Sequence, residues 1–173
     1  MTAINDTPTN LNYLSPLNFQ FQIKKAPHVN FFIQKVNIPS LTLKSVIIPN
    51  QFAPVPYPGE HLDYGELKIT FKVDELLQNY LEIHNWIRYI GKLDYGEYAN
   101  IEKNPSWTGD GIYSDITVSV LSNIKTINYD ATFTDAYPVD LSDITFNTTD
   151  EDVKYIEASA TFKYTYYNIS QTI

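Results

Sequence analysis

The C-terminal third of the chain carries the stretch that decides the fold: Ala136-Tyr137-Pro138, Val139-Asp140-Leu141-Ser142-Asp143, Ile144-Thr145-Phe146, and then residues 155–167. Proline fixes its φ angle and has no N–H to donate, so the first three residues predict a turn after a strand. The next five predict a short polar loop, and the three after them a strand. The last stretch predicts a strand rich in aromatic residues, because from 157 onward small or aromatic side chains alternate with polar ones.

The same period-two alternation predicts four strands upstream of this turn, and the turns around Pro27 and Pro39 set off two more. A second turn, at Ala26-Pro27-His28, separates the first two strands, and the first three are expected to form an antiparallel meander. Each strand has one polar face and one apolar face, as in a sheet that is covered on one side. The predicted strands are residues 17–25, 29–38, a strand that begins near Leu41, 65–74, 114–125 and 127–136.

The hydrophobic period changes from two to between three and four after Asp74, which predicts one amphipathic helix. Asp74 is a good N-cap residue, and Gly91 is suited to end the helix. A helix of four to five turns is marginal in water by itself, so its apolar stripe must pack on the sheet. The stripe consists of Leu76, Leu77, Tyr80, Leu81, Ile83, His84, Ile87 and Ile90.

Three segments lack periodicity. Residues 1–16 predict a flexible N-terminal arm, and residues 17–173 a single domain. Residues 49–59 contain four prolines and predict an extended loop or arm between strands, since proline removes backbone donors. Residues 92–111 predict a long irregular loop, a kind of segment that is usually functional in a compact domain.

Composition excludes several classes of function. The formal net charge is −8 and the pI is about 4.7, which argues against a surface that grips phosphates. An acidic surface does suit a wall past which DNA slides without adsorbing. The chain has no cysteine, its first ten residues do not resemble a signal peptide, and no stretch is apolar enough to insert in a membrane. Fourteen tyrosines favour sheets and interfaces.

The sequence contains no motif for catalysis, a cofactor or a metal. The three histidines lie in different segments without ligand spacing, and His61 with Asp63 is better explained by a solvated turn than by a metal site. Tyr95, Tyr98 and Trp107 could stack on a sugar, which leaves a carbohydrate-binding β-sandwich module as an alternative. An acidic hydrolase is a weaker alternative, because no nucleophile elbow or phosphate loop is present.

The order of these elements resembles the tail-tube family of contractile-tailed bacteriophages over roughly residues 17–169. The opening strand, Leu17-Asn18-Phe19-Gln20-Phe21-Gln22-Ile23, and the second, Asn30-Phe31-Phe32-Ile33-Gln34-Lys35-Val36, look like those of the family. The resemblance includes Ile38-Pro39-Ser40-Leu41, Pro58-Gly59-Glu60, the strand-to-helix junction at Asp74-Glu75 with Trp86, and the ending Tyr164-Thr165-Tyr166-Tyr167.

The resemblance implies a mainly β (α+β) fold, an antiparallel β-sandwich or barrel of about seven strands with one flanking α-helix. It also implies a non-enzymatic virion protein without cofactors, assembled in the bacterial host cytoplasm into stacked hexameric rings around a channel for DNA. Implied partners are other copies and other tail, sheath or baseplate proteins. A baseplate initiator, a tail completion or terminator protein and a secretion-system tube protein remain alternatives within the same fold.

Two groups of residues are candidates for these roles. The polar faces of the strands at 114–125 and 127–136 would line the lumen, although an outer surface would show the same alternation: Asp115, Thr117, Ser119, Asn123, Asn128, Asp130, Thr132 and Thr134. The proline arm and the aromatic residues of the long loop would form contacts between subunits, because neither segment can bury enough apolar surface alone: Pro49, Phe52, Pro54, Pro56, Tyr57, Pro58, Tyr95, Tyr98 and Trp107.

Overall fold

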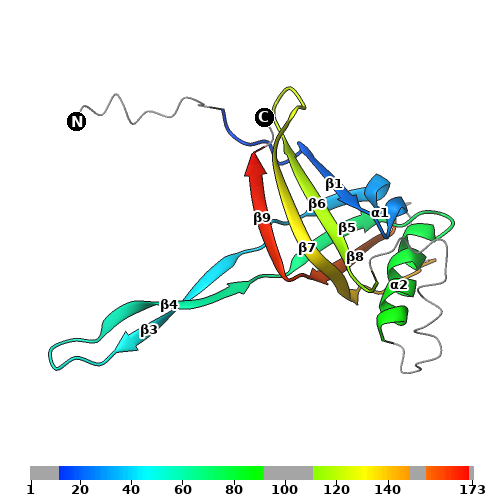
Figure 1. Cartoon of the computed structure of the whole chain (residues 1–173). Coiled ribbons are helices and arrows are strands. Elements are labelled where there is room, and N and C mark those ends of the chain that lie inside the picture. Colours follow the sequence, from blue (N-terminus) through cyan, green and yellow to red (C-terminus); the bar gives the residue numbers. More distant parts are fainter. Residues whose placement is uncertain (1–11, 92–110, 149–154, 172–173) are drawn as a thin grey trace.

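The computed structural model describes residues 12–91, 111–148 and 155–171, which form nine strands and two helices (Figure 1). In chain order the elements are β1 (Phe19–Ile23), α1 (Pro27–Phe32), β2 (Ile33–Val36), β3 (Leu41–Ile48), β4 (Val55–Tyr64), β5 (Leu67–Lys72), α2 (Gln78–Ile90), β6 (Ser114–Leu121), β7 (Ile127–Leu141), β8 (Glu157–Lys163) and β9 (Tyr166–Gln171).

Seven strands form one antiparallel sheet, and the other two form a separate hairpin. The order in the sheet is β1-β6-β7-β8-β5-β2, and β9 also pairs with β7. The first half of β7 pairs with β6 and β9, whereas its second half pairs with β8. The long strand β7 therefore joins two parts of the sheet, β1-β6-β7-β9 and β7-β8-β5-β2, and the predicted antiparallel β fold with a flanking helix is confirmed.

β7 also accounts for an error of the sequence prediction. Ala136-Tyr137-Pro138 is not a turn but part of this strand, and Pro138 pairs with Phe162 of β8. The bend lies one residue earlier, at Asp135, whose positive φ of 55° is unusual for a residue other than glycine. The expected strand at Ile144–Phe146 is absent, since residues 142–147 have no regular structure.

The core fills the space between the two parts of the sheet and the helices. Phe133 of β7 and Phe162 of β8 are fully buried, and Ile83 and Trp86 place α2 against this layer. The indole N–H of Trp86 donates a hydrogen bond to the carbonyl of Ile112, 2.9 Å away, so this buried polar group is satisfied. The helix packs on the core as predicted, but only part of the predicted stripe does so. Ile83 is buried and Tyr80, Ile87 and Ile90 are partly buried, whereas Leu76 and Leu81 are exposed.

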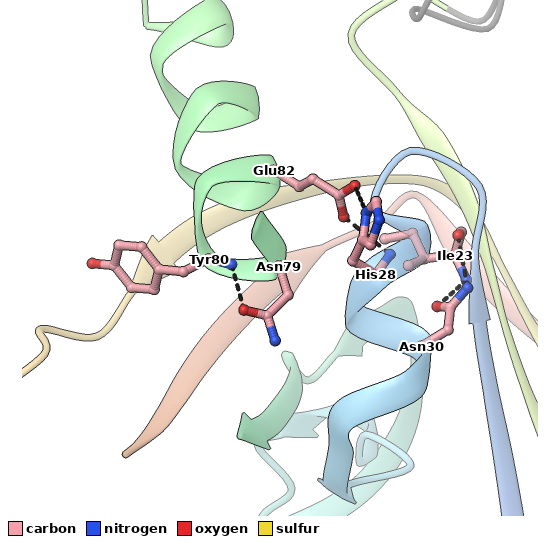
Figure 2. A network of polar contacts seen from close by, with 6 residues as sticks. All are labelled: Ile23, His28, Asn30, Asn79, Tyr80 and Glu82. Atoms are coloured by element: carbon pink, nitrogen blue, oxygen red, sulfur yellow. Dashed lines mark hydrogen bonds and ion pairs between the residues drawn. The ribbon is translucent and has the colours of Figure 1, made fainter. Parts of the chain in front are cut away.

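The N-terminal meander is a second error. β1 pairs with β6, β2 with β5 and β3 with β4, so none of the first three strands pairs with another. The predicted strand at 29–38 begins as the short helix α1, with Pro27 in its first turn. Asn30 fixes this helix to β1, because its side chain exchanges two hydrogen bonds with the backbone of Ile23 (Figure 2).

The start of α2 differs from the prediction as well. The helix begins at Gln78 rather than after Asp74, and the cap position is held by Leu77 with a left-handed φ of 57°. Buried Asn79 supplies the polar contacts instead: its side-chain oxygen accepts the N–H groups of Asp74 and Tyr80, and its amide donates to Lys72. Gly91 does end the helix, donating to the carbonyl of Ile87.

The remaining differences concern strand ends. The final strand predicted at 157–167 is two strands, β8 and β9, which contact different halves of β7. The proline segment 49–59 is not wholly a loop, because β4 begins at Val55 and runs through two prolines. These prolines are tolerated because β4 belongs to a two-stranded ribbon, in which one edge needs no ladder donors. Figure 1 shows the β3–β4 hairpin projecting far from the body.

Candidate assembly and channel surfaces

In its two central rows, one face of the β1-β6-β7-β9 part carries polar side chains that are uncharged except for Asp130. Residues that are paired across antiparallel strands share a face, so the register defines rows that cross all four strands. The opposite face of the same strands is the buried core, with Phe21, Val118 and Ala131 in one row. The two polar rows are Gln22, Thr117, Thr132 and Asn168, and Gln20, Ser119, Asp130 and Ser170.

Most of the predicted lumen residues lie on this face. The register pairs Thr117 with Thr132 and Ser119 with Asp130, side by side on the two central strands. Asn123 does not share the face, because it lies in the β6–β7 turn beyond the paired residues. By strand alternation Asp115 and Thr134 belong to the same face, near one end. Asn128 lies at a register shift between β6 and β7, so alternation does not assign it to this face.

The outer strands of this surface were not predicted from the sequence. Gln20 and Gln22 were recognised as a polar strand face but not as neighbours of β6, since strand pairing is not visible in one sequence. Asn168 and Ser170 were missed because β9 was not predicted as a separate strand. The alternation of polar and apolar residues from 166 to 171 was the available signal.

Both outer strands of this four-stranded part leave one edge unpaired within the described residues. β1 pairs only with β6, and β9 only with β7. Unpaired N–H and C=O groups on an edge form a template for another strand. Because the four strands alternate in direction, β1 and β9 run in opposite directions, so β9 of one copy can pair antiparallel with β1 of the next.

The β3–β4 hairpin contains the described part of the predicted interface residues. Pro49, Phe52 and Pro54 lie in the segment between the strands, where Phe52 is 92% exposed. Pro56, Tyr57 and Pro58 lie in β4 and are also exposed. Tyr95, Tyr98 and Trp107 lie outside the described residues, so their interface role and the carbohydrate alternative stay predictions.

Four aromatic rings fix the base of the hairpin to the body. Tyr64, the last residue of β4, contacts Tyr164 and Tyr167 edge to face at centroid distances of 6.1 and 5.7 Å. Phe133 packs below the same two tyrosines. The Tyr164 hydroxyl donates to the carbonyl of Gly65, and burial raises the pKa of Tyr164 to about 12. These ring contacts therefore hold the base of the hairpin against the body of the protein.

The His61 and Asp63 pair forms part of an ion-pair cluster on this hairpin. The Asp63 carboxylate lies 2.9 Å from Lys44 Nζ and 3.3 Å from His61 Nε2. The hydrogen bond from Lys44 lowers the pKa of Asp63 below its ordinary value. Within the described ranges, no three His, Cys, Asp or Glu side chains gather as a metal site would require, and neither helix is long and apolar enough to cross a membrane.

A comparison with protein families shows which family this chain belongs to. The model of the phage tail tube protein family matches residues 6–170. The chain belongs to this family. It is thus a structural component of a phage tail and part of the virion, and the resemblance inferred from its sequence is confirmed.

Three proteins to which this tail tube family member is similar are named as terminators or a terminating cap of tubes. The chain is 26% identical over 167 residues to the tail tube terminator protein of Enterobacteria phage T4, which covers 92% of this chain and 90% of the T4 protein. Its fold is similar to the tube terminating cap of the anti-feeding prophage, with a TM-score of 0.63, 13% identity and coverage of 99% and 100%. It is also similar to the sheath/tube terminator of an extracellular contractile injection system, with a TM-score of 0.60, 13% identity and coverage of 93% and 99%.

Proposed function

We propose that six copies of this chain close into a ring that ends a phage tail tube and surrounds the channel for DNA. The observation that carries the proposal is the pair of unpaired, oppositely directed edges on β1 and β9, on either side of one polar face. Pairing of β9 with the β1 of a neighbour would satisfy both edges and, repeated around the ring, leave no edge at all.

The polar rows suit the wall of a DNA channel. They contain hydroxyl and amide groups with a single carboxylate, Asp130, and neither row contains Lys or Arg. Strong DNA adsorption requires cations that release the counterions of phosphates, and this face has none in its two central rows. DNA would pass such a surface with little affinity.

Six copies give a channel of suitable size. Each copy would contribute the four strands β1, β6, β7 and β9 to a barrel of roughly 24 strands, more than the 16–18 strands that already leave an aqueous channel in porins. With strands about 4.8 Å apart and tilted by about 40°, such a barrel measures on the order of 45–50 Å across at the backbone. That width leaves room for a DNA duplex inside the side chains.

The T4 relative favours a role at the end of the tube, because it is a tail tube terminator protein and the match covers 90% of its length. The second candidate is a main tube subunit, which the family description supports. Cryo-EM of tails with the tagged protein distinguishes the two: we expect one ring at one end of each tube. Many stacked rings along the tube would establish the main tube subunit instead. Sheath or baseplate proteins are the further partners we propose.

Proline substitutions test ring closure through β9. The N–H groups of consecutive residues in β9 point alternately toward β7 and outward. Of the two substitutions Asn168→Pro and Ile169→Pro, only one therefore removes a backbone hydrogen bond to β7 within the monomer. We expect the other variant to keep the monomer fold and to lose ring formation, because proline blocks the incoming strand.

The measurements are circular dichroism for the fold and native mass spectrometry with sedimentation for the ring. The unsubstituted chain should form hexamers. A strictly monomeric chain that never enters a tail particle would contradict the proposed function. If the folded proline variant forms hexamers as well as the unsubstituted chain does, closure of the ring through β9 is wrong, and the proposed ring itself is not contradicted.

A further inference from the structure

Phe31 of the short helix α1 is more exposed than any other large apolar side chain in the helices and strands that the structure describes. It is 92% exposed, whereas Val29, two residues earlier, is fully buried in the core. An aromatic side chain that stays in water contributes little to the stability of the monomer, and its burial by a partner would be favourable. The exposed face of α1 is therefore available for a contact outside its own chain.

The position of α1 is fixed at the C-terminal end of β1. The side chain of Asn30 exchanges two hydrogen bonds, of 3.0 and 3.2 Å, with the backbone of Ile23, the last residue of β1. On the other side, the Glu82 carboxylate of α2 accepts the backbone N–H of His28 at 3.2 Å (Figure 2). A helix that is held on two sides presents Phe31 in a defined place, so little ordering is required when a partner binds.

Ring closure would bring this end of β1 to one particular part of the neighbouring copy. In an antiparallel pair, the C-terminal end of one strand lies beside the N-terminal start of the other. β9 starts at Tyr166, and β8 ends at Lys163, so the chain turns between them. This β8–β9 corner, residues 163–166, is therefore the part of the neighbour that lies beside the end of β1 and the helix that follows it.

The β8–β9 corner offers a fixed aromatic surface. Tyr164 is partly buried and packs on Phe133 of the core, with the ring centroids 4.9 Å apart. The N–H of Thr165 donates to a carbonyl of β7 at 3.0 Å. Tyr166 is 48% exposed, and Lys163 is exposed beside it. Aromatic rings pack favourably on tyrosines and beneath a lysine ammonium group, so the corner suits a phenylalanine.

From this arrangement we infer that, in the assembled ring, α1 of each copy packs Phe31 against the β8–β9 corner of the adjacent copy. The inference rests on the proposed ring and adds a side-chain contact to the backbone pairing of β1 with β9. Exposed strand edges can pair with many other strands, because the backbone groups are the same in every sequence. A phenylalanine docked on the corner fixes which residues of the two edges meet, and it thereby selects one register.

A second copy is the occupant that the geometry favours. α1 directly follows an edge strand that we propose to join another copy, so the same neighbour can cover its exposed side chain. In a closed symmetric ring every copy presents one α1 and one β8–β9 corner to its two neighbours. Each Phe31 would then be covered, and no corner would be left over.

A pair of cysteines in one chain tests this contact, because the chain contains no native cysteine. Phe31→Cys with Thr165→Cys places one thiol on α1 and one on the corner. A short bismaleimide should then link neighbours in assembled rings into covalent chains of up to six copies, which a denaturing gel separates. Phe31→Cys with Ile124→Cys is the matched control, since Ile124 is 82% exposed in the β6–β7 turn, at the opposite end of the strands. If the first variant fails to assemble, Phe31→Cys with Lys163→Cys replaces it.

Phe31→Asp measures what the contact contributes to assembly. Circular dichroism should show an unchanged monomer, because the side chain lies outside the core. Sedimentation should show that the concentration needed for half-assembly rises on the order of tenfold or more, as expected when a buried phenylalanine is lost from each contact. Phe146→Asp is the control, because Phe146 is 74% exposed but lies outside both edge strands and the corner.

Covalent chains from the Phe31 and Thr165 pair, but not from the control pair, would support the contact. Rings that yield no such chains would overturn this inference and leave the proposed ring intact, and so would normal assembly of Phe31→Asp. If Phe31→Asp weakens only the attachment of finished rings to other tail proteins, the partner of α1 is not a second copy and the inference is wrong. An unsubstituted chain that forms no rings would instead contradict the proposed function itself.

Discussion

At the scale of single residues, Asn79 shows how one buried amide replaces a helix cap. Its side-chain oxygen accepts the N–H groups of Asp74 and Tyr80 at 3.2 and 2.8 Å, and its amide donates to the carbonyl of Lys72 at 2.8 Å. The end of β5 and the start of α2 are therefore joined by a single side chain. Leu77 can keep its left-handed backbone because these contacts hold the chain on both sides of it.

Asn79→Ala should lower the free energy of unfolding by about 1–3 kcal/mol, because it leaves buried backbone groups without partners. Chemical denaturation of the monomer measures the change. Gln78→Ala, at the exposed neighbouring residue, is the matched control and should change stability by less than about 0.5 kcal/mol. Equal effects of the two substitutions would mean that Asn79 does not hold the junction.

At the scale of elements, a contact between the two helices responds to pH. The Glu82 carboxylate of α2 accepts the backbone N–H of His28 at the start of α1, and its other oxygen lies 2.5 Å from His28 Nδ1 (Figure 2). The hydrogen bond to Glu82, and secondly its charge, raise the pKa of His28 above its ordinary value of 6.5. The contact therefore contributes its full stability below the unfolded pKa near 6.5 and loses it as pH rises through the higher folded pKa.

Glu82→Gln keeps the shape of the side chain but removes the charge. We expect the pKa of His28 to fall toward its ordinary value, and the dependence of the thermal midpoint on pH to flatten in that range. NMR titration of the His28 ring measures the first effect, and Glu60→Gln on the distant hairpin is the control. An unchanged pKa of His28 in Glu82→Gln would rule out this origin of the shift.

The elements also show what local patterns can predict. The alternation in 65–74 and the helical period after Asp74 gave β5 and α2, because both depend on neighbours in the chain. The prediction of one strand over 157–167 missed that the apolar positions change from even numbers in β8, such as Ala160 and Phe162, to odd numbers in β9, such as Ile169. The two strands pair with different halves of β7. The bend in β7 at Asp135 likewise depends on those pairings, whereas the sequence predicted a turn at Ala136-Tyr137-Pro138.

The candidate channel surface, too, was predicted only where the pattern within one strand indicates it. Thr117 and Thr132 were predicted from the alternation of their own strands, and the structure pairs them. The contribution of β1 and β9 to the surface required knowledge of which strands are neighbours. The paired residues lie 93 to 101 positions apart for β1 and β6, and 32 to 42 positions apart for β7 and β9, so a single sequence does not reveal these pairings. The proline hairpin was predicted as an arm, but the pairing of its two strands depends on register.

At the scale of the whole molecule, apolar surface is divided between a core and surfaces that the monomer leaves open. The core unites both parts of the sheet with α1 and α2, whereas the hairpin and a groove near β9 remain exposed. Exposed surface of this kind adds nothing to the stability of the monomer. It contributes only when another chain covers it, so stability and assembly can be changed separately.

The N-terminal arm provides the last test of that separation. Tyr13 and Leu14 are 95% and 69% exposed, and the first anchored side chain after them is Asn18, whose amide donates to the carbonyl of Ser122. Deletion of residues 1–16 should therefore shift the thermal midpoint of the monomer little, because no core residue is removed. Ring formation should weaken, since residues 12–15 line an uncharged groove and expose apolar side chains that a neighbouring copy can cover. Calorimetry and sedimentation of the truncated chain measure the two effects, with Ala substitutions of Tyr13 and Leu14 as the milder variant. A truncated chain that unfolds would place the arm in the core, and one that forms rings as readily as the full chain would exclude it from assembly.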